Sequence, residues 1–232
     1  MHSNRYIFIY SSILVIVVAM ALTVVAVQLK PLQENNIRIE KMQNILSSIH
    51  VKATVNNAEE MYSKYIVSSF VINASANEIK DVDAFKVNIA AEHKKSTDDR
   101  KLPVFVAKLD NGDTSLVFPV YGKGLWGPVW GYISLQKDFN TVLGVVFDHK
   151  GETPGLGAEI NTEWFQERFN GKTLFNEDGK FTSVQVLKGT HNDDPHVVDA
   201  ISGSTITCSG VSLMLVDCME LYEPFLKAKL KR

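Results

Sequence analysis

The longest apolar segment of the chain runs from residue 6 to residue 29 and contains no charged side chain. A helix of about 24 residues is long enough to cross the hydrocarbon core of a bilayer, which is ~30 Å thick. Arg5 and Lys30 flank the segment, and Tyr6 and Tyr10 lie near one end, where aromatic rings prefer the membrane interface. We therefore predict a transmembrane helix over residues 6–29, with a short tail of residues 1–5 before it.

A cleaved signal peptide is the alternative interpretation of this segment. Its apolar region is usually only ~7–15 residues long and is followed by a small-residue cleavage site. The apolar run here is longer, and no clean A-x-A follows it. These two features favour an uncleaved anchor.

The composition of the whole chain limits what the remainder can be. Hydrophobic residues make up 45% and charged residues 22%, values that exclude disorder as the dominant state. A net charge of −2 argues against a nucleic-acid partner, because such proteins need a surplus of basic side chains. Two cysteines cannot form a four-cysteine metal centre. Cys208 and Cys218 are ten residues apart in one predicted helix, too far for a disulfide.

Hydrophobic patterning predicts an α+β domain with a central, mostly antiparallel sheet and flanking helices. Strands rich in Val, Ile, Phe and Tyr are expected at residues 104–108, 115–121, 129–136, 141–148 and 181–188. Helices are expected at residues 31–50, 57–69, 162–169 and 208–229. Pro224 is expected to kink or shorten the last helix. We place a membrane-proximal helix and linker at residues 30–56 and the folded domain at residues 57–232.

The first segment with residue types suited to a ligand is GKGLWGPVWG, residues 122–131. Its four glycines allow close approach of the backbone to a ligand, and its two tryptophans, Trp126 and Trp130, offer stacking surfaces. A tight turn with core tryptophans is the alternative.

The second segment is DHKGETPGLGAEI, residues 148–160, a glycine-rich loop that follows an apolar strand. Glu152 and Thr153 place an acceptor and a hydroxyl on it, and an ordinary surface loop is the alternative. His149, Glu152 and Glu159 lack the HExxH spacing of a metal site, so no metal is expected.

The third segment is DAISGSTITCS, residues 199–209, at the start of the last predicted helix. It sets five hydroxyls around one glycine, those of Ser202, Ser204, Thr205, Thr207 and Ser209. The first N–H groups of a helix are free and carry partial positive charge, so this position suits a phosphate. A plain helix cap is the alternative. No GK[ST] follows, which excludes a Walker A loop, and no G-x-S-x-G suggests a hydrolase nucleophile.

The chain contains, in this order, an N-terminal span, the motifs GLW, ETPGLG and DAISGST, and a final helix. This order resembles the FMN-binding domain family over essentially the whole chain. Within it, GLWGPVWGY looks most similar to the C-subunit family of bacterial sodium-translocating NADH:quinone oxidoreductases. The G subunit of the related Rnf electron-transport complex is the alternative. A membrane-anchored binding module without redox function is another.

The resemblance implies one FMN per chain, bound covalently by a phosphoester to the threonine of the family motif D-x-x-[ST]-G-A-T. Matched to residues 199–205, the motif makes Thr205 the acceptor, with Thr207 as its rival. Ser204 departs from the family, which usually has alanine there. The cofactor-binding residues that the resemblance implies are Trp126, Glu152, Thr153, Gly155, Leu156, Gly157, Lys188, Ser202, Gly203, Ser204 and Thr207.

The resemblance also implies a function and a location. The chain is expected to be an electron-carrying component of a membrane redox pump, relaying electrons through FMN without itself binding NADH. No G-x-G-x-x-G lies between a predicted strand and a predicted helix, in agreement with this, since GKGLWG at residues 122–127 leads into another predicted strand. Expected partners are the other subunits of the complex, the lipid bilayer and a flavin transferase that attaches FMN from FAD. The N-terminus is expected in the cytoplasm and the folded domain in the periplasm, on the bacterial inner membrane.

Overall fold

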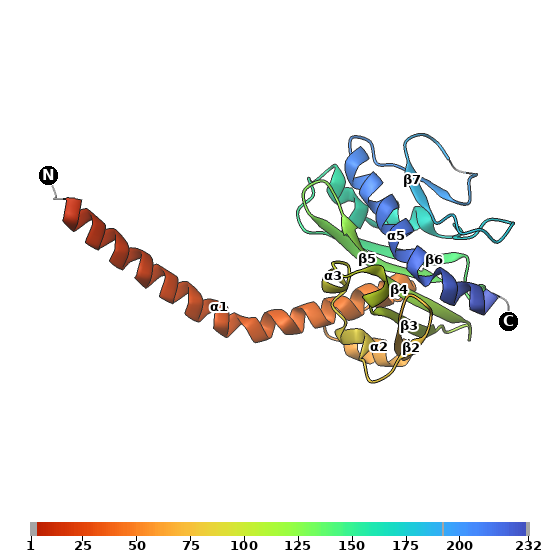
Figure 1. Ribbon diagram of the computed structural model, residues 1–232, viewed down its shortest axis with the longest axis horizontal. Helices are drawn as coiled ribbons and strands as arrows, with labels where there is room; N and C mark the ends of the chain where they lie inside the picture. The colour runs from red at the N-terminus through yellow and green to blue at the C-terminus, as the bar shows by residue number, and fades with distance from the viewer. Residues whose placement is uncertain (1–3, 192, 231–232) are drawn as a thin grey trace. The chain divides into compact units, whose positions relative to one another are not determined.

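The structure is a computed structural model that describes residues 4–191 and 193–230, so part of the expected tail at residues 1–5 lies outside the described residues. The chain divides into two compact units, Met1–Lys41 and Met42–Arg232. Helix α1 (Asn4–Ser48) contains the predicted span, and it is long and apolar enough to cross a membrane (Figure 1). The helix runs through Pro31, so the helix predicted at residues 31–50 is continuous with the span.

The second unit contains a six-stranded antiparallel sheet with strand order β2-β1-β3-β4-β5-β6. Its strands are β1 (Ile66–Ile72), β2 (Glu78–Ile79), β3 (Leu102–Lys108), β4 (Thr114–Lys123), β5 (Pro128–Leu135) and β6 (Val142–His149). A short parallel pair, β7 (Gln185–Leu187) and β8 (Val197–Asp199), lies outside this sheet. The helices of the unit, besides the end of α1, are α2 (Ala58–Tyr65), α3 (Ile89–Glu92), α4 (Glu163–Gln166) and α5 (Thr205–Leu230), with 3-10 turns at Ala84–Lys86, Thr97–Asp99, Gly157–Asn161 and Glu167–Phe169. The predicted α+β class is confirmed.

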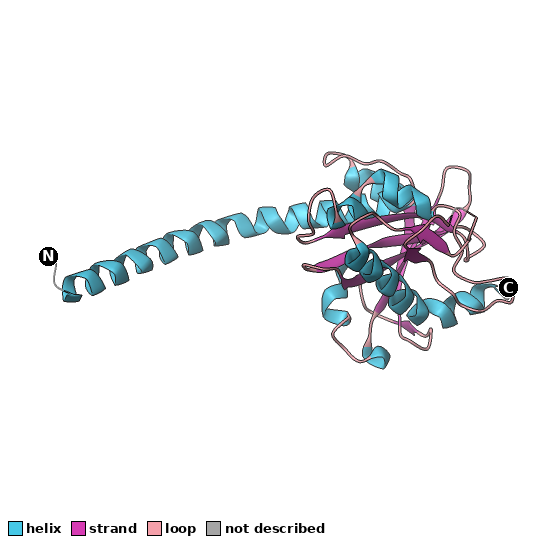
Figure 2. Cartoon of the chain, turned by 90° about the horizontal axis from the view of Figure 1, so that it is seen from above, coloured by secondary structure: helices cyan, strands magenta, loops and turns pink. Residues whose placement is uncertain are grey.

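Both faces of the sheet are covered by other elements. Successive side chains along a strand point to opposite faces, and here they are buried in two different clusters. Val104 and Phe118 pack in the cluster beneath α5, which crosses one face (Figure 2). Phe105 and Val117 pack in a second cluster with residues from the end of α1 and from α2. The candidate site lies where α5 begins, at one end of the first cluster.

The folded unit begins before residue 57, the predicted start of the domain. Ile45 and Leu46, near the end of α1, are fully buried in the second cluster. Hydrogen bonds also tie this end of α1 to the sheet, because Ser134 Oγ donates to the carbonyl of Ser48 and His50 Nε2 lies 2.7 Å from the carbonyl of Leu143. Part of the segment predicted as linker is therefore core.

Three predicted elements have different limits in the structure. The helix predicted at residues 57–69 ends at Tyr65, and residues 66–72 form β1, since this β-branched and aromatic run pairs with β3. The strand predicted at residues 181–188 shortens to β7, because Ser183 has a positive φ of 62° that breaks the extended backbone. The last helix begins three residues early, at Thr205, and continues through Pro224 to Leu230.

Candidate functional site

Three segments that are far apart in the sequence meet at one hollow of about 220 Å³. They are the loop between β4 and β5, the loop after β6, and the first turn of α5. Figure 1 shows the β4–β5 loop beside the start of α5, where the Lys123 carbonyl closely approaches Gly210. The residues that line the hollow are Leu125, Glu152, Thr153, Leu156, Gly157, Gly203, Ser204, Thr205, Ile206 and Thr207.

Glu152 joins the three segments. Its side chain is buried, and the residue is only 4% exposed. One carboxylate oxygen accepts the backbone N–H of Trp126 at 2.8 Å, and the other accepts the hydroxyl of Thr207 at 2.6 Å. The backbone N–H of Glu152 donates to Nδ1 of His149 at 3.1 Å. Hydrogen bonds to an ionised acceptor are stronger than neutral ones, so this carboxylate fixes the shape of the site.

Glycines allow the segments to approach this carboxylate. A Cβ atom at Gly124 would lie 2.6 Å from Glu152 Oε1. At Gly157 it would lie 2.6 Å from both Glu152 Oε2 and Thr207 Oγ1. Gly203 has a φ of +77°, a conformation that residues with side chains rarely adopt. Each of the three sequence motifs therefore contains a glycine that close packing or backbone conformation requires at this site.

The start of α5 places hydroxyls and free N–H groups at the hollow. The carbonyl of Ser204 accepts the N–H of Cys208 at 2.9 Å, which makes Ser204 the residue preceding the first helical turn. Thr205 is exposed, whereas Thr207 is buried and its hydroxyl donates a hydrogen bond to Glu152. A helix start of this kind favours an anion.

Large apolar side chains around the hollow are unusually exposed. Trp126 is 69% exposed and Ile206 is 59% exposed, and Leu125 and Leu156 are both above 40%. Exposed apolar side chains gathered in one place on a protein surface indicate a binding site. An anion site beside an apolar rim suits a ligand with a phosphate at one end and a flat apolar ring at the other.

Most of the residues singled out from the sequence line this hollow, namely Glu152, Thr153, Leu156, Gly157, Gly203, Ser204, Thr205 and Thr207. Trp126 is not in the lining but contributes its backbone N–H to Glu152. Gly155 turns the loop with a φ of +74°, and Ser202 lies exposed beside Gly203. Lys188 is exposed in the loop after β7 and is not among the lining residues.

Two lining residues, Leu125 and Ile206, were not singled out from the sequence. Each lies next to a motif residue, Trp126 or Thr205, and an apolar side chain at such a position is also typical of ordinary core. The signal that could have identified them is their high exposure, which only the fold reveals.

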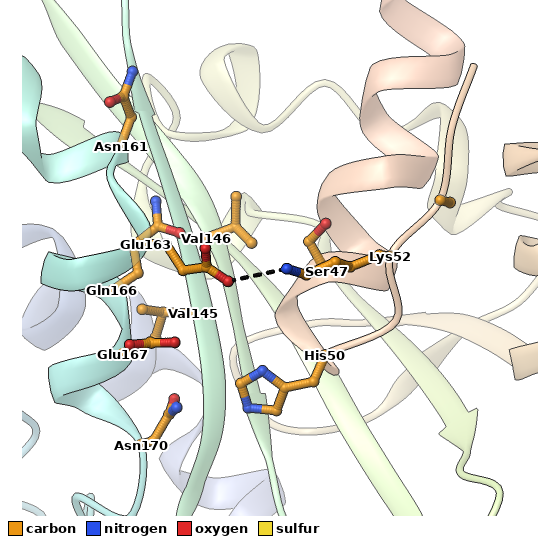
Figure 3. A pocket seen from close by; sticks show the side chains of 11 residues that line it. Ser47, His50, Lys52, Val145, Val146, Asn161, Glu163, Gln166, Glu167 and Asn170 are labelled. Atoms are coloured by element: carbon orange, nitrogen blue, oxygen red, sulfur yellow. Dashed lines mark hydrogen bonds and ion pairs between the residues drawn. The ribbon is translucent and has the colours of Figure 1, made fainter.

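A second hollow, of about 420 Å³, lies between the end of α1 and α4 (Figure 3). Lys52 and Glu163 on its walls pair with each other at 3.2 Å. It contains none of the residues singled out from the sequence. Lys52 and Glu163 neutralise each other there, and Glu167 also lines the hollow.

Neither a metal nor a thiol is indicated as the reactive group. Within the described residues, no group of three or more His, Cys, Asp or Glu side chains is placed to hold a metal ion. Burial raises the pKa of the Cys218 thiol to about 11 and also raises the pKa of Cys208. Both thiols therefore stay protonated near neutral pH, the less reactive form of a cysteine.

The segments that form the hollow match those of known proteins. The FMN-binding domain family matches residues 124–220, from the β4–β5 loop through most of α5. The C subunit of the Na+-translocating NADH-quinone reductase of Haemophilus ducreyi is 34% identical over 201 residues, which are 80% of this chain and 78% of that protein. The chain belongs to the C-subunit family of Na+-translocating NADH-quinone reductases.

Solved structures of this C-subunit family have the same fold. The structure of the family member from Parabacteroides distasonis matches with a TM-score of 0.77 and 39% identity, over 85% of this chain and 96% of that one. The NqrC structure from Shewanella oneidensis matches with a TM-score of 0.70 and 30% identity, over 82% of this chain and 98% of that one. These relatives confirm the resemblance found in the sequence, and they belong to the quinone reductase rather than to the Rnf complex.

Proposed function

We propose that this chain is the electron-carrying component of a membrane Na+-translocating NADH:quinone reductase and that it holds one FMN at the start of α5. The observation that carries the proposal is the hollow itself, in which an anion-favouring helix start lies beside the exposed side chains of Leu125, Leu156 and Ile206. FMN, when bound, accepts and donates the electrons, while the protein orients it and sets its electrostatic surroundings.

The residues of the hollow fit the two ends of FMN. The first N–H groups of α5 and the hydroxyls around Gly203 suit the phosphate. The exposed apolar rim suits the isoalloxazine ring, and Glu152 places negative charge and fixed hydrogen bonds beneath this surface. Lys188 is assigned from the resemblance alone, as a positive charge that pairs with the phosphate or with the anion of the reduced flavin.

We propose Thr205 as the covalent attachment site. The rival Thr207 is buried, and its hydroxyl already donates to Glu152 at 2.6 Å. Attachment there would break that bond and would require a transferase to reach a buried atom. Thr205 is exposed at the first position of the helix. In the proposed reaction a phosphoester forms between Thr205 Oγ1 and the FMN phosphorus of FAD, the pyrophosphate bond breaks, AMP leaves and the hydroxyl proton is released.

The partners and location follow from the family assignment and from α1. We propose that α1 anchors the chain in the lipid bilayer with a single span, the N-terminus in the cytoplasm and the folded unit in the periplasm. The other partners proposed are the remaining subunits of the reductase and the flavin transferase.

The test is to produce the full chain with a flavin transferase and to measure intact mass and in-gel fluorescence after denaturation. The wild-type chain should carry one covalent FMN. Thr205→Val should carry none, and Thr205→Ser should recover part of the signal because it restores a hydroxyl. Thr207→Val, the matched control, should keep the FMN. Loss of FMN in Thr207→Val with retention in Thr205→Val would overturn the assignment.

A further inference from the structure

We propose that the side chain of Ser204 is a ligand of the FMN phosphate, donating a hydrogen bond from its hydroxyl to a phosphate oxygen. This inference rests on the proposed FMN site and gives the Ser204 hydroxyl a specific role there, that of a phosphate ligand that is not joined to the cofactor. The observation behind it is a buried hydroxyl for which the described part of the protein provides no partner.

Ser204 occupies the position at which a serine normally caps a helix. A capping serine accepts a hydrogen bond from the backbone N–H two or three residues later, here Ile206 or Thr207. The Ser204 hydroxyl does not do so. Among the described residues it has no hydrogen-bond partner, although the residue is only 5% exposed. The hydroxyl is therefore not explained by helix capping.

Buried polar groups in folded proteins almost always have a partner, so an unpaired one calls for an explanation. Ser204 lines the hollow together with Thr205 and Thr207. The carboxylate in the hollow does not explain it, because the Glu152 oxygens already accept bonds from Trp126 and Thr207. Among the described residues, nothing accepts a hydrogen bond from this hydroxyl.

A phosphate oxygen supplies such an acceptor. The helix start already favours an anion there, and a hydroxyl that donates to a charged acceptor forms one of the stronger protein hydrogen bonds. The neighbouring Gly203 has no side chain to cover the hydroxyl, and a Cβ atom there would lie 2.8 Å from Leu156. An ordered water could also pair with this hydroxyl, and a comparison of two flavins separates the two cases.

The experiment compares FMN with riboflavin, which has the same ring but no phosphate. The full chain is purified in detergent without the transferase, and dissociation constants for both flavins are measured by fluorescence titration. Ser204→Ala should weaken FMN binding by roughly 10-fold or more and leave riboflavin binding unchanged, as expected for one hydrogen bond to a charged group. Ser209→Ala is the matched control, because this exposed hydroxyl lies near the same helix start but does not line the hollow.

Thermal unfolding of the flavin-free chain separates this role from helix capping. Since the hydroxyl makes no hydrogen bond to the described residues, Ser204→Ala should leave the Tm unchanged or raise it, whereas loss of a true cap would lower it. Ser204→Gly, which a helix start tolerates, provides a second variant with the same expected loss of FMN binding.

An unchanged ratio of FMN to riboflavin affinity in both Ser204 variants would overturn the inference while leaving the FMN site intact, and it would assign the hydroxyl to a water. A lowered Tm with equal weakening of both flavins would also overturn it, in favour of a cap. Failure of the wild-type chain to bind either flavin would overturn the proposed function and this inference with it.

Discussion

At the scale of single residues, Glu152 does the most to define the site. It brings together the β4–β5 loop, its own loop and the first turn of α5 through bonds to Trp126 and Thr207. Both partners donate a hydrogen atom, and each carboxylate oxygen accepts one of them. The side chain therefore has a structural role in the flavin-free chain as well as a proposed role beside the flavin.

Replacing Glu152 by glutamine tests both roles. The amide oxygen can still accept the N–H of Trp126, and the amide nitrogen can donate to the Thr207 hydroxyl, so both contacts remain but lose the charged acceptor. Because hydrogen bonds to a charged group are stronger than neutral ones, we expect Glu152→Gln to lower the free energy of unfolding by about 1 kcal/mol. Covalent FMN should remain, with a shifted redox potential, because a negative charge has been removed. Calorimetry and redox titration measure these effects.

Glu177→Gln is the control for this change, since Glu177 is exposed in a turn remote from the hollow in sequence. Glu177→Gln should change neither the free energy of unfolding nor the redox potential of the flavin. An unchanged flavin potential in Glu152→Gln would remove Glu152 from the surroundings of the ring, even if stability fell.

At the scale of secondary-structure elements, the central strands could be predicted and their neighbours only in part. β3 to β6 are long, β-branched runs whose limits the sequence predicted closely, and their shared sheet follows from hairpin connections. β1 was missed because its serines and apolar residues also fit the end of a helix, and only pairing with β3 decides between them.

The candidate site was predictable where residue type alone carried the signal. In three short motifs the glycine, glutamate and hydroxyl residues were of types suited to a ligand, with an ordinary turn, loop or helix cap as the alternative for each. The bond from Thr207 to Glu152, which separates Thr205 from its rival, joins residues 55 positions apart. No local pattern encodes that contact. The exposure of Leu125 and Ile206 could not be predicted either, because it also depends on contacts between distant parts of the sequence.

Helix α5 packs closely against the β4–β5 hairpin at Gly210. A Cβ atom at Gly210 would lie 2.3 Å from the backbone carbonyl of Lys123, which cannot rotate away. Gly210→Ala should therefore push α5 from the hairpin and lower the free energy of unfolding by about 1–3 kcal/mol. It should also reduce FMN attachment, because the helix start forms one wall of the hollow.

The measurement is chemical denaturation of the variant beside Ser209→Ala, an exposed neighbour on the same helix whose replacement should be nearly neutral. Equal stability of the two variants would show that α5 does not approach the hairpin this closely.

At the scale of the whole molecule, the chain combines two units with different surroundings. The side chains of α1 over the predicted span are apolar and largely exposed, as a helix in lipid requires. The second unit buries its apolar side chains on both faces of its sheet. Every residue that lines the candidate site belongs to this second unit. The proposed chemistry therefore depends on the folded unit, and the anchor contributes membrane attachment.

We propose that FMN is joined to the start of α5 at Thr205. The most direct test is tandem mass spectrometry of the protease-digested native chain, isolated from cells that contain the flavin transferase. Fragment ions should place one FMN on Thr205, with Ser202, Ser204 and Thr207 unmodified in the same peptide. FMN on Thr207, or an unmodified peptide from cells that flavinylate other proteins, would contradict attachment at Thr205.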